Sequence, residues 1–233
     1  MKDGYWLMGF QYELTGSLYS LGRIPRCKVA MLERLKPGDK LLVAGVGHGT
    51  EAIEAAGRGV DVTAVDISKT MLKYMQKKID RVKPNRPIRM VNNDILQVKY
   101  PAEFDMVIAN YFLNVFPQEK MLAILTHLTT FVKPGGFMVI GDFTLPREGG
   151  RFYRAFQTAY WYVAAFIYWL TADNAVHPIY DYPALLKSLG FEIEESKHFK
   201  MLGMNCHWSI LGRKRAGNGS SPIAYRAGDK SSF

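Results

Sequence analysis

A glycine-rich turn between two apolar segments constrains the fold of this chain more than any other feature. Residues 40–49 read KLLVAGVGHG, so an apolar strand enters a turn that has glycine at alternate positions. The next apolar run, VTAV, ends at Asp66. Glycine lets a backbone approach a ligand closely, and a carboxylate after the second strand can accept hydrogen bonds from a ribose. The pattern therefore predicts a β-α-β unit that binds a nucleoside.

Apolar runs and helical patterns alternate along most of the chain. We expect strands at 40–45, 60–65, 87–91, 104–109 and 137–142, closing strands near 191–195 and 205–211, and helices at 49–57, 68–82, 118–132, 151–170 and 181–189. Almost wholly apolar strands that alternate with helices favour a parallel sheet with helices on both faces. The segment KPGG at 133–136 predicts a turn between a helix and the strand after it.

The sequence divides into a regular middle and two different ends. Residues 1–36 are rich in aromatic side chains and favour an N-terminal helical cap segment. Residues 37–213 are expected to form one α/β domain, with a helical cap inserted at about 146–182. The tail at 214–233 is basic and rich in Gly and Ser, and it is expected to be disordered.

The composition is that of a globular domain and limits the partners. The 233 residues, of which 48% are hydrophobic, are enough for one domain with its own core. The net charge of +9 is divided between the tail and the whole body, so we expect solvated charge and no nucleic acid. The two cysteines, Cys27 and Cys206, have no metal-ligand spacing, so we expect no metal site. A cytoplasmic location is expected, with peripheral contact to an anionic membrane as an alternative.

The glycine positions separate two kinds of nucleoside-binding unit. A dinucleotide fingerprint needs glycine where Thr50 stands, whereas the glycines here are Gly45, Gly47 and Gly49. This spacing resembles motif I of the class I S-adenosylmethionine-dependent methyltransferases. Asp66 stands at the position of that family's ribose-binding acid.

Further segments carry the same resemblance. They are NDI at 93–95, FDMVIAN at 104–110, VKPGG at 132–136 and the closing pair of strands, and together the matches cover roughly residues 15–213. The resemblance implies a Rossmann-like α/β fold with a seven-stranded, mostly parallel sheet and an antiparallel last strand. It also implies helices on both faces and an aromatic helical cap inserted after strand five.

The resemblance implies S-adenosyl-L-methionine as the cofactor. Asp66 is expected at the ribose, Asp94 near the adenine, and Asn110 at the wall of the pocket. The full set of expected cofactor-binding residues is Gly45, Gly47, Gly49, Asp66, Ile67, Asp94, Ile95, Asn110 and Tyr19.

One position departs from the pattern of the family. The family usually has an acidic residue two positions before the first glycine of motif I, and here that residue is Val43. The missing carboxylate normally helps to position the methionine end of the cofactor. Another polar group, such as His48 or Tyr19, substitutes for it, or cofactor affinity is weak, or the strand tolerates the loss. We favour tolerance.

The acceptor is expected between the N-terminal segment, the turn after strand four and the cap insertion. The run at 155–172 has no charged residue and is strongly aromatic. It predicts a cap helix that packs on the domain or lines an apolar pocket, with some rings resting on a membrane. Its length and its scattered aromatic residues argue against a membrane span. We therefore expect a small, lipophilic acceptor.

Candidate catalytic residues lie on two loops. A sulfonium methyl needs an aligned nucleophile, and it needs a base only when the nucleophile begins protonated. In the loop before Pro183 we expect His177 as the base and Tyr180, or alternatively Tyr182, to orient the acceptor. Tyr111 is expected to line the site from the turn after strand four. The loop groups could instead satisfy the backbone and cap the following helix.

The sequence favours a methyltransferase that acts on a quinone-like ring or on another oxygen or carbon nucleophile. A phospholipid or small amine is the alternative acceptor, because the layout resembles small quinone and phospholipid methyltransferases only at the level of the fold. A nicotinamide-dependent oxidoreductase shares the first β-α-β unit, but Thr50 and the closing strands argue against it. A protein that binds the cofactor without methyl transfer stays open because of Val43.

Overall fold

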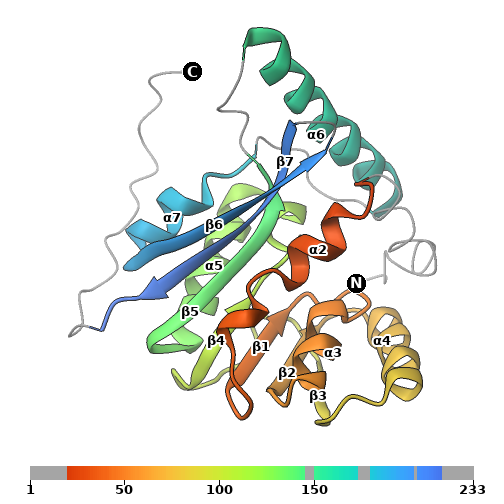
Figure 1. The fold of residues 1–233 in the computed structure, drawn as a ribbon, viewed down its shortest axis with the longest axis vertical. Helices are drawn as coiled ribbons and strands as arrows, with labels where there is room; N and C mark the ends of the chain where they lie inside the picture. The colour runs from red at the N-terminus through yellow and green to blue at the C-terminus, as the bar shows by residue number, and fades with distance from the viewer. Residues whose placement is uncertain (1–19, 145–149, 173–178, 202–203, 217–233) are drawn as a thin grey trace.

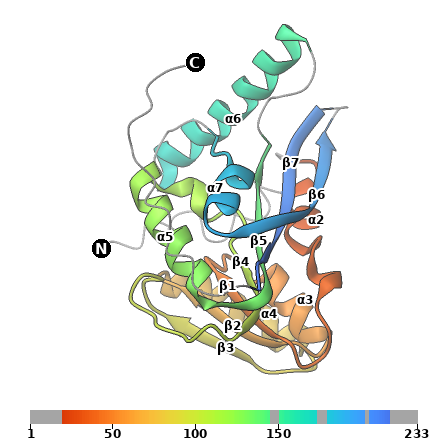
Figure 2. The ribbon, with the colours of Figure 1, turned by 90° about the vertical axis from the view of Figure 1, so that its left-hand side faces the viewer.

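The computed structural model describes residues 20–144, 150–172, 179–201 and 204–216. These residues form a seven-stranded sheet with helices against both faces (Figure 1 and Figure 2). The strands are β1 Lys40–Ala44, β2 Asp61–Asp66, β3 Ile88–Asn92, β4 Phe104–Ile108, β5 Val132–Phe143, β6 Phe191–Met201 and β7 Met204–Lys214. The helices are α2 Arg23–Val29, α3 Thr50–Gly57, α4 Lys69–Val82, α5 Gln118–Phe131, α6 Arg151–Ala172 and α7 Tyr182–Ser188, with short 3-10 helices η1 Leu32–Arg34 and η2 Leu113–Val115.

The strand order confirms the expected fold class. The sheet runs β3-β2-β1-β4-β5-β7-β6. The pairs among β1 to β5 are parallel, and β7 is antiparallel to both of its neighbours. The chain moves outward from β1 to β3 and then returns to β4 beside β1. In open α/β sheets, ligands bind outside the carboxyl ends of the strands at such a reversal of strand order.

Alternation along the strands divides the core between the two faces of the sheet. In β1, Leu42 and Ala44 belong to the core layer that contains α5 and α7, whereas Leu41 and Val43 belong to the layer with α2, α3 and α4. All four side chains are fully buried. Successive strand side chains point to opposite faces, so helices on both sides require an almost wholly apolar strand.

Two polar side chains start helices by capping them. Ser68 Oγ accepts a hydrogen bond from Met71 N–H at 3.2 Å at the start of α4. Asp181 Oδ1 accepts one from Ala184 N–H at 3.2 Å at the start of α7. Both caps satisfy N–H groups that a helix start leaves without a partner. Part of the loop before α7 therefore caps that helix. This agrees with the alternative in which the polar groups of the loop serve the backbone rather than catalysis.

The expected start of the fifth strand is wrong. β5 begins at Val132 rather than at residue 137, because Val132 already pairs with Phe104 of β4. Phe137 then pairs with Met106, so the KPGG segment bulges out of the ladder between these two pairs. The segment interrupts the strand instead of preceding it.

The closing strands are longer than the expected 191–195 and 205–211. β6 and β7 stay paired as far as Met201 and Met204. Exposed and half-buried side chains alternate along β6, so backbone pairing rather than apolar burial carries this segment, and apolar patterning underestimates its length. β7 ends at Lys214, one residue into the segment expected to be disordered.

Helix α6 follows β5 and lies across the end of the sheet near β7 (Figure 1). It confirms the helix expected at 151–170. Gln157 and Trp161 face the protein and are buried, whereas Phe152 is 93% exposed. Within the described ranges, no helix combines the length and the hydropathy that a bilayer span requires.

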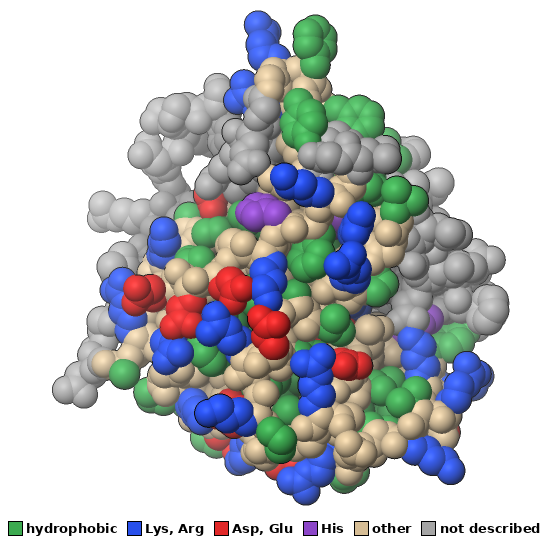
Figure 3. All heavy atoms as spheres, in the orientation of Figure 1, with side chains coloured by type: hydrophobic (Ala, Val, Ile, Leu, Met, Phe, Trp, Pro, Cys, Tyr) green, Lys and Arg blue, Asp and Glu red, His purple; other side chains and the backbone are tan. Residues whose placement is uncertain are grey.

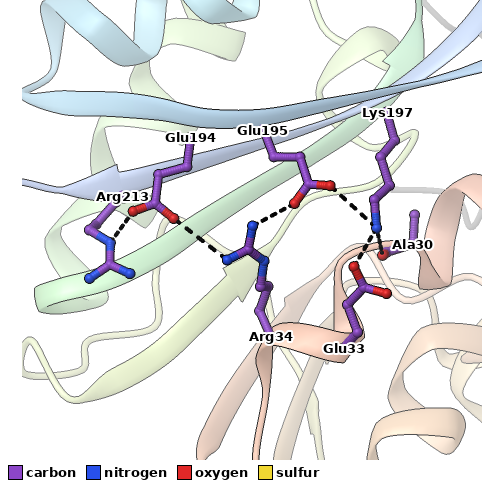
Figure 4. Close-up of polar contacts among 7 residues, drawn as sticks. All are labelled: Ala30, Glu33, Arg34, Glu194, Glu195, Lys197 and Arg213. Atoms are coloured by element: carbon purple, nitrogen blue, oxygen red, sulfur yellow. Dashed lines mark hydrogen bonds and ion pairs between the residues drawn. The ribbon is translucent and has the colours of Figure 1, made fainter.

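A chain of charged side chains connects η1 to β6 (Figure 4). Arg34 contacts Glu195 at 2.7 Å, and Lys197 donates a hydrogen bond to Ala30 O at 3.2 Å. The hydrogen bond from Arg34 lowers the pKa of Glu195. The complete network consists of Glu33, Arg34, Glu194, Glu195, Lys197, Arg213 and the carbonyl of Ala30.

We predict that Glu195→Gln lowers the free energy of unfolding by less than about 1 kcal/mol at neutral pH, because the network is partly exposed to water and screened by salt. Since the folded pKa of Glu195 is lowered, this stabilisation is present above the ordinary carboxyl pKa and is lost as the pH falls through the folded value. Urea unfolding at neutral and acidic pH measures the difference. Glu192→Gln, at an exposed position of the same strand, is the control. A loss of stability that persists unchanged at acidic pH would contradict the prediction.

Candidate functional site

The glycine turn, residues 45–49, follows β1 and leads into α3. Gly45 and Gly49 have φ angles of 70° and 76°, in the left-handed region that glycine adopts most easily. A Cβ at Gly45 would overlap the ring of Phe112, and a Cβ at Gly49 would lie 2.5 Å from Met75 Cγ. Both the backbone conformation and the available space therefore exclude larger residues at these positions.

Asp66 joins the glycine turn to the end of β2. Its Oδ1 accepts a hydrogen bond from Ser68 N–H at 2.8 Å, and its Oδ2 accepts one from Gly47 N–H at 3.4 Å. The next residue, Ile67, is 51% exposed. Asn92 Nδ2 donates to the carbonyls of Asp66 and Ile67 at 3.0 and 2.9 Å and holds this segment against β3. An oriented carboxylate and an exposed apolar side chain thus follow one another at the end of β2.

Asp94 and Ile95 follow β3. Asp94 Oδ1 accepts a hydrogen bond from Leu96 N–H at 3.0 Å, and Asp94 N–H donates to Asn93 Oδ1 at 2.9 Å. Ile95 is only 5% exposed and belongs to the core. Because β1, β2 and β3 are parallel neighbours, the glycine turn, Asp66 and Asp94 all come to the carboxyl edge of the sheet.

Asn110 follows β4 and directs its side chain toward the helices. Its Nδ2 donates to Lys28 O at 2.9 Å and lies within hydrogen-bond distance of Glu51 Oε1 at 3.4 Å. The residue is 2% exposed. The side chain therefore connects the end of β4 to α2 and α3, below the surface on which we expect the pocket wall.

A buried ion pair lies beside Asn110. Lys28 Nζ of α2 is 3.7 Å from Glu51 Oε2 of α3, and the two side chains are 9% and 0% exposed. Among the residues that the structure describes, Glu51 Oε2 and Asn110 Oδ1 are two of eight buried side-chain nitrogen and oxygen atoms without a hydrogen-bond partner, and the side chains of these two residues lie next to each other. Such groups are uncommon in folded proteins and call for a specific explanation.

His207 of β7 lies between two tyrosine hydroxyls. Tyr111 Oη is 3.1 Å from its Nδ1, and Tyr160 Oη is 3.4 Å from its Nε2. Burial lowers the pKa of His207 to about 3, so the ring is neutral at physiological pH. A neutral imidazole has one donor nitrogen and one acceptor nitrogen, so His207 can accept from one tyrosine and donate to the other.

Tyr111 itself has an unusual backbone. Its φ angle is 51°, which is uncommon for a residue other than glycine. Its N–H donates to Gly141 O at 2.8 Å, which holds the conformation against β5. Backbone strain of this kind is often found at functional sites.

Aromatic rings surround the two hydroxyls. Phe143 of β5 packs against Trp161 and His207, with ring centroids 4.8 and 4.9 Å apart, and against Tyr111 and Tyr160 at 6.0 Å each. We call these five residues the aromatic cluster. Its members come from the turn after β4, from β5, from α6 and from β7, so the cap helix and the sheet meet here.

Asp142 precedes the aromatic cluster in β5 and is a buried carboxyl. It accepts hydrogen bonds from Tyr182 Oη at 2.6 Å, Phe143 N–H at 2.7 Å and Asn114 Nδ2 at 2.8 Å. Burial raises the pKa of Asp142 to about 7, although the three hydrogen bonds favour the charged form. The carboxyl therefore titrates close to neutral pH.

Two of the loop residues predicted to act in catalysis, Tyr180 and Tyr182, are buried. Tyr180 is 8% exposed, and its hydroxyl donates to Phe116 O at 2.9 Å. Burial raises the pKa of Tyr180 to about 12, so this hydroxyl stays protonated. Tyr182 is fully buried against Asp142. His177 and Tyr19 lie outside the described residues.

Four of these polar residues were not predicted from the sequence as site residues. They are Lys28, Glu51, Asp142 and His207. Asp142 and His207 are titratable residues inside apolar strand patterns, and Glu51 interrupts the Ala-rich start of a helix, so the sequence does contain a signal for three of the four. Within the described ranges, no group of three or more His, Cys, Asp and Glu residues could hold a metal ion.

The methyltransferase domain family matches residues 41–136 of this chain. The matched range contains the glycine turn, Asp66, Asp94 and Asn110. A demethylmenaquinone methyltransferase of Renibacterium salmoninarum is 30% identical over 155 residues, which are 64% of this chain and 59% of the relative. A cypemycin N-terminal methyltransferase of a Streptomyces species is 30% identical over 59% of this chain and 54% of its own length. The chain thus spans less than two thirds of these curated relatives.

Crystal structures with the same fold are more distant in sequence. Magnesium protoporphyrin IX methyltransferase from Synechocystis with bound SAM has a TM-score of 0.63 at 18% identity, over 92% of this chain and 98% of that one. The [4+2]-cyclase SpnF has a TM-score of 0.62 at 16% identity, over 83% of this chain and 81% of its own. These similarities extend the shared fold well beyond residues 41–136.

We predict that Asp142→Asn changes how stability depends on pH. The folded pKa of Asp142 is raised from 3.8 to about 7, so the wild type loses stability as the pH rises through this window, because the unfolded chain ionises first. The variant lacks this titration. Between acidic and neutral pH, the free energy of unfolding of the wild type should therefore fall by roughly 2–4 kcal/mol more than that of the variant. Urea unfolding of both proteins across this window gives the difference. Parallel stability curves would contradict the prediction.

Proposed function

Because this chain carries a methyltransferase domain and has the class I methyltransferase fold, we propose that it binds S-adenosyl-L-methionine and transfers the methyl group to a small, lipophilic acceptor. The observation that carries the proposal is the glycine turn joined to Asp66 at the point where the strand order reverses. Ligands of such sheets bind at this point. The structural neighbour from Synechocystis was crystallised with bound SAM, which supports the choice of cofactor.

The described residues at the carboxyl edge have the chemistry that this cofactor needs. In our proposal the glycine turn approaches the ligand, Asp66 accepts hydrogen bonds from the ribose hydroxyls, and exposed Ile67 packs on the adenine. Asp94 lies near the adenine amino group, and Ile95 supports it from the core. Two further expected residues complete the set: Asn110 lies below the edge at the end of β4, and Tyr19 remains a proposal for the N-terminal segment, outside the described residues.

The cofactor would supply a methyl group that is already activated by its sulfonium. The protein therefore has to hold the acceptor in line with the methyl group and exclude water. The aromatic cluster is suited to both tasks, because its rings pack against one another and two of them come from α6. Flat apolar groups pack well on such rings.

Tyr111 is the polar group of the aromatic cluster that we propose to contact the acceptor. Its hydroxyl is held by His207, whose neutral ring has one donor and one acceptor nitrogen and lies between the hydroxyls of Tyr111 and Tyr160. His207 is thus a positioning residue for Tyr111. His177 is proposed as the base. Tyr180 forms part of the wall rather than orienting the substrate, because its hydroxyl donates to Phe116 O.

A quinone-like ring is the acceptor that we favour. Relatives named demethylmenaquinone methyltransferase, at about 30% identity, support it, and so does the aromatic character of the cluster. A small or peptide amine is the second candidate, because a relative of similar identity is named as a cypemycin N-terminal methyltransferase. A role without methyl transfer is the third, because SpnF has this fold and is named as a [4+2]-cyclase.

We also propose that α6 contacts a membrane surface, where a lipophilic acceptor would be found. Phe152 is 93% and Phe156 is 54% exposed, and exposed Arg151 and Arg154 flank them. Figure 3 shows hydrophobic and basic side chains together at the upper end of the molecule, where α6 begins in Figure 1. Apolar rings with neighbouring cations are typical of a helix at an anionic lipid surface.

We predict that Asp66→Asn weakens the binding of S-adenosylhomocysteine by roughly 10- to 100-fold, because it removes charged hydrogen bonds to the ribose. Isothermal titration calorimetry measures the affinity. Asp61→Asn, at the exposed start of the same strand, is the matched control and should bind as the wild type does. Equal affinity of the Asp66 variant and the wild type would show that the ribose is not bound there.

We predict that Tyr111→Phe lowers kcat for a demethylmenaquinol-like acceptor by roughly 100-fold, because the hydroxyl held by His207 is lost. The affinity for S-adenosylhomocysteine should stay unchanged. Tyr162→Phe, at a position 43% exposed on α6, controls for the loss of a hydroxyl elsewhere. Unchanged kcat in the Tyr111 variant would remove Tyr111 and His207 from the reaction.

A further inference from the structure

The buried pair Lys28–Glu51 has no role in the site described so far. The charged atoms are 3.7 Å apart, too far for a hydrogen bond, and Glu51 is fully buried. Removing both charges from water costs free energy, and a single long ion pair does not repay that cost. The donor-less atoms Glu51 Oε2 and Asn110 Oδ1 increase it. The cost suggests that these groups serve a ligand.

The pair lies on the same face of the sheet as Val43, the position where the related enzymes usually have an acid. Val43 belongs to the core layer with α2 and α3, and it pairs in register with Ile108 of β4. Asn110 lies two residues further on, so it emerges on the same face, and its amide contacts Lys28 O and Glu51 Oε1. A carboxylate is therefore present near the end of β4, but α3 supplies it instead of β1.

The position of Glu51 in the chain also places this carboxylate near the glycine turn. Glu51 is the second residue of α3 and lies two residues after Gly49, the last residue of the glycine turn. The side chain of Lys28 is 9% exposed, slightly more than that of Glu51, which is 0% exposed. The cation and the anion thus lie next to the turn that approaches the cofactor in our proposal.

We propose that Lys28 and Glu51, together with Asn110, recognise the amino-acid end of the cofactor, and that Glu51 takes the part of the acid missing at position 43. That end of the cofactor carries an α-ammonium and an α-carboxylate. The ammonium is matched by the buried acceptors Glu51 Oε2 and Asn110 Oδ1, neither of which has a hydrogen-bond donor among the described residues, and the carboxylate by Lys28. The inference rests on the proposed binding of S-adenosyl-L-methionine.

Two ligands test the proposal by calorimetry. S-adenosylhomocysteine has the amino-acid end, whereas 5′-methylthioadenosine has the same nucleoside and a thioether without it. Glu51→Gln should weaken the binding of the first ligand by roughly tenfold or more and leave the second nearly unchanged. Glu54→Gln, an exposed position on the same helix, should affect neither ligand.

A second variant removes the risk that an unpaired buried charge unfolds the protein. Lys28→Met with Glu51→Gln removes both charges, and such neutral replacements usually fold well. This variant should bind 5′-methylthioadenosine as the wild type does and should lose the preference for S-adenosylhomocysteine.

Each outcome decides between two statements. If both variants keep the wild-type ratio of the two affinities, the pair is structural and the inference is wrong. If the wild type binds S-adenosylhomocysteine no more tightly than 5′-methylthioadenosine, the amino-acid end adds nothing to binding. The nucleoside site then stands, and the inference is again wrong. If the wild type binds neither ligand, the proposed function itself fails.

Discussion

The left-handed backbone of the glycine turn determines what the carboxyl edge of this sheet can do. No side chain fits at Gly45 or Gly49, and this short turn leads from β1 into α3, whose first turn contacts Asn110 at the end of β4. The same compact turn donates a hydrogen bond from Gly47 to Asp66 and so orients the carboxylate of the neighbouring strand. The proposed cofactor site thus depends on one local conformation.

The end of β4 joins the two halves of the site. Asn110 contacts α2 and α3, beside the buried Lys28–Glu51 pair. The next residue, Tyr111, contacts His207 in the aromatic cluster. Polar groups buried on both sides cost stability, and proteins tend to keep such costs at functional positions. Cofactor and acceptor would therefore meet at this short segment, which is held in a conformation that few residues adopt.

Local patterns predicted most of the fold but only part of the site. Apolar runs and glycine spacing predicted the order of the elements, because both express backbone geometry directly. The start of β5 at Val132 was not predictable in this way, since it depends on pairing with Phe104 across the sheet. For His207 the sequence shows only a titratable residue inside an apolar strand, because its two tyrosine partners come from distant parts of the chain. Long-range contacts of this kind leave no periodic signal in the sequence.

Transfer of an isotopically labelled methyl group tests the central claim most directly. The protein would be incubated with methyl-labelled S-adenosyl-L-methionine and vesicles that contain a reduced demethylmenaquinone. Our account predicts label in the quinone ring and one S-adenosylhomocysteine for each methyl group transferred. Tight binding of the cofactor without label in this acceptor, or in amines offered in its place, would contradict methyl transfer and would leave a protein that uses the class I fold for another purpose.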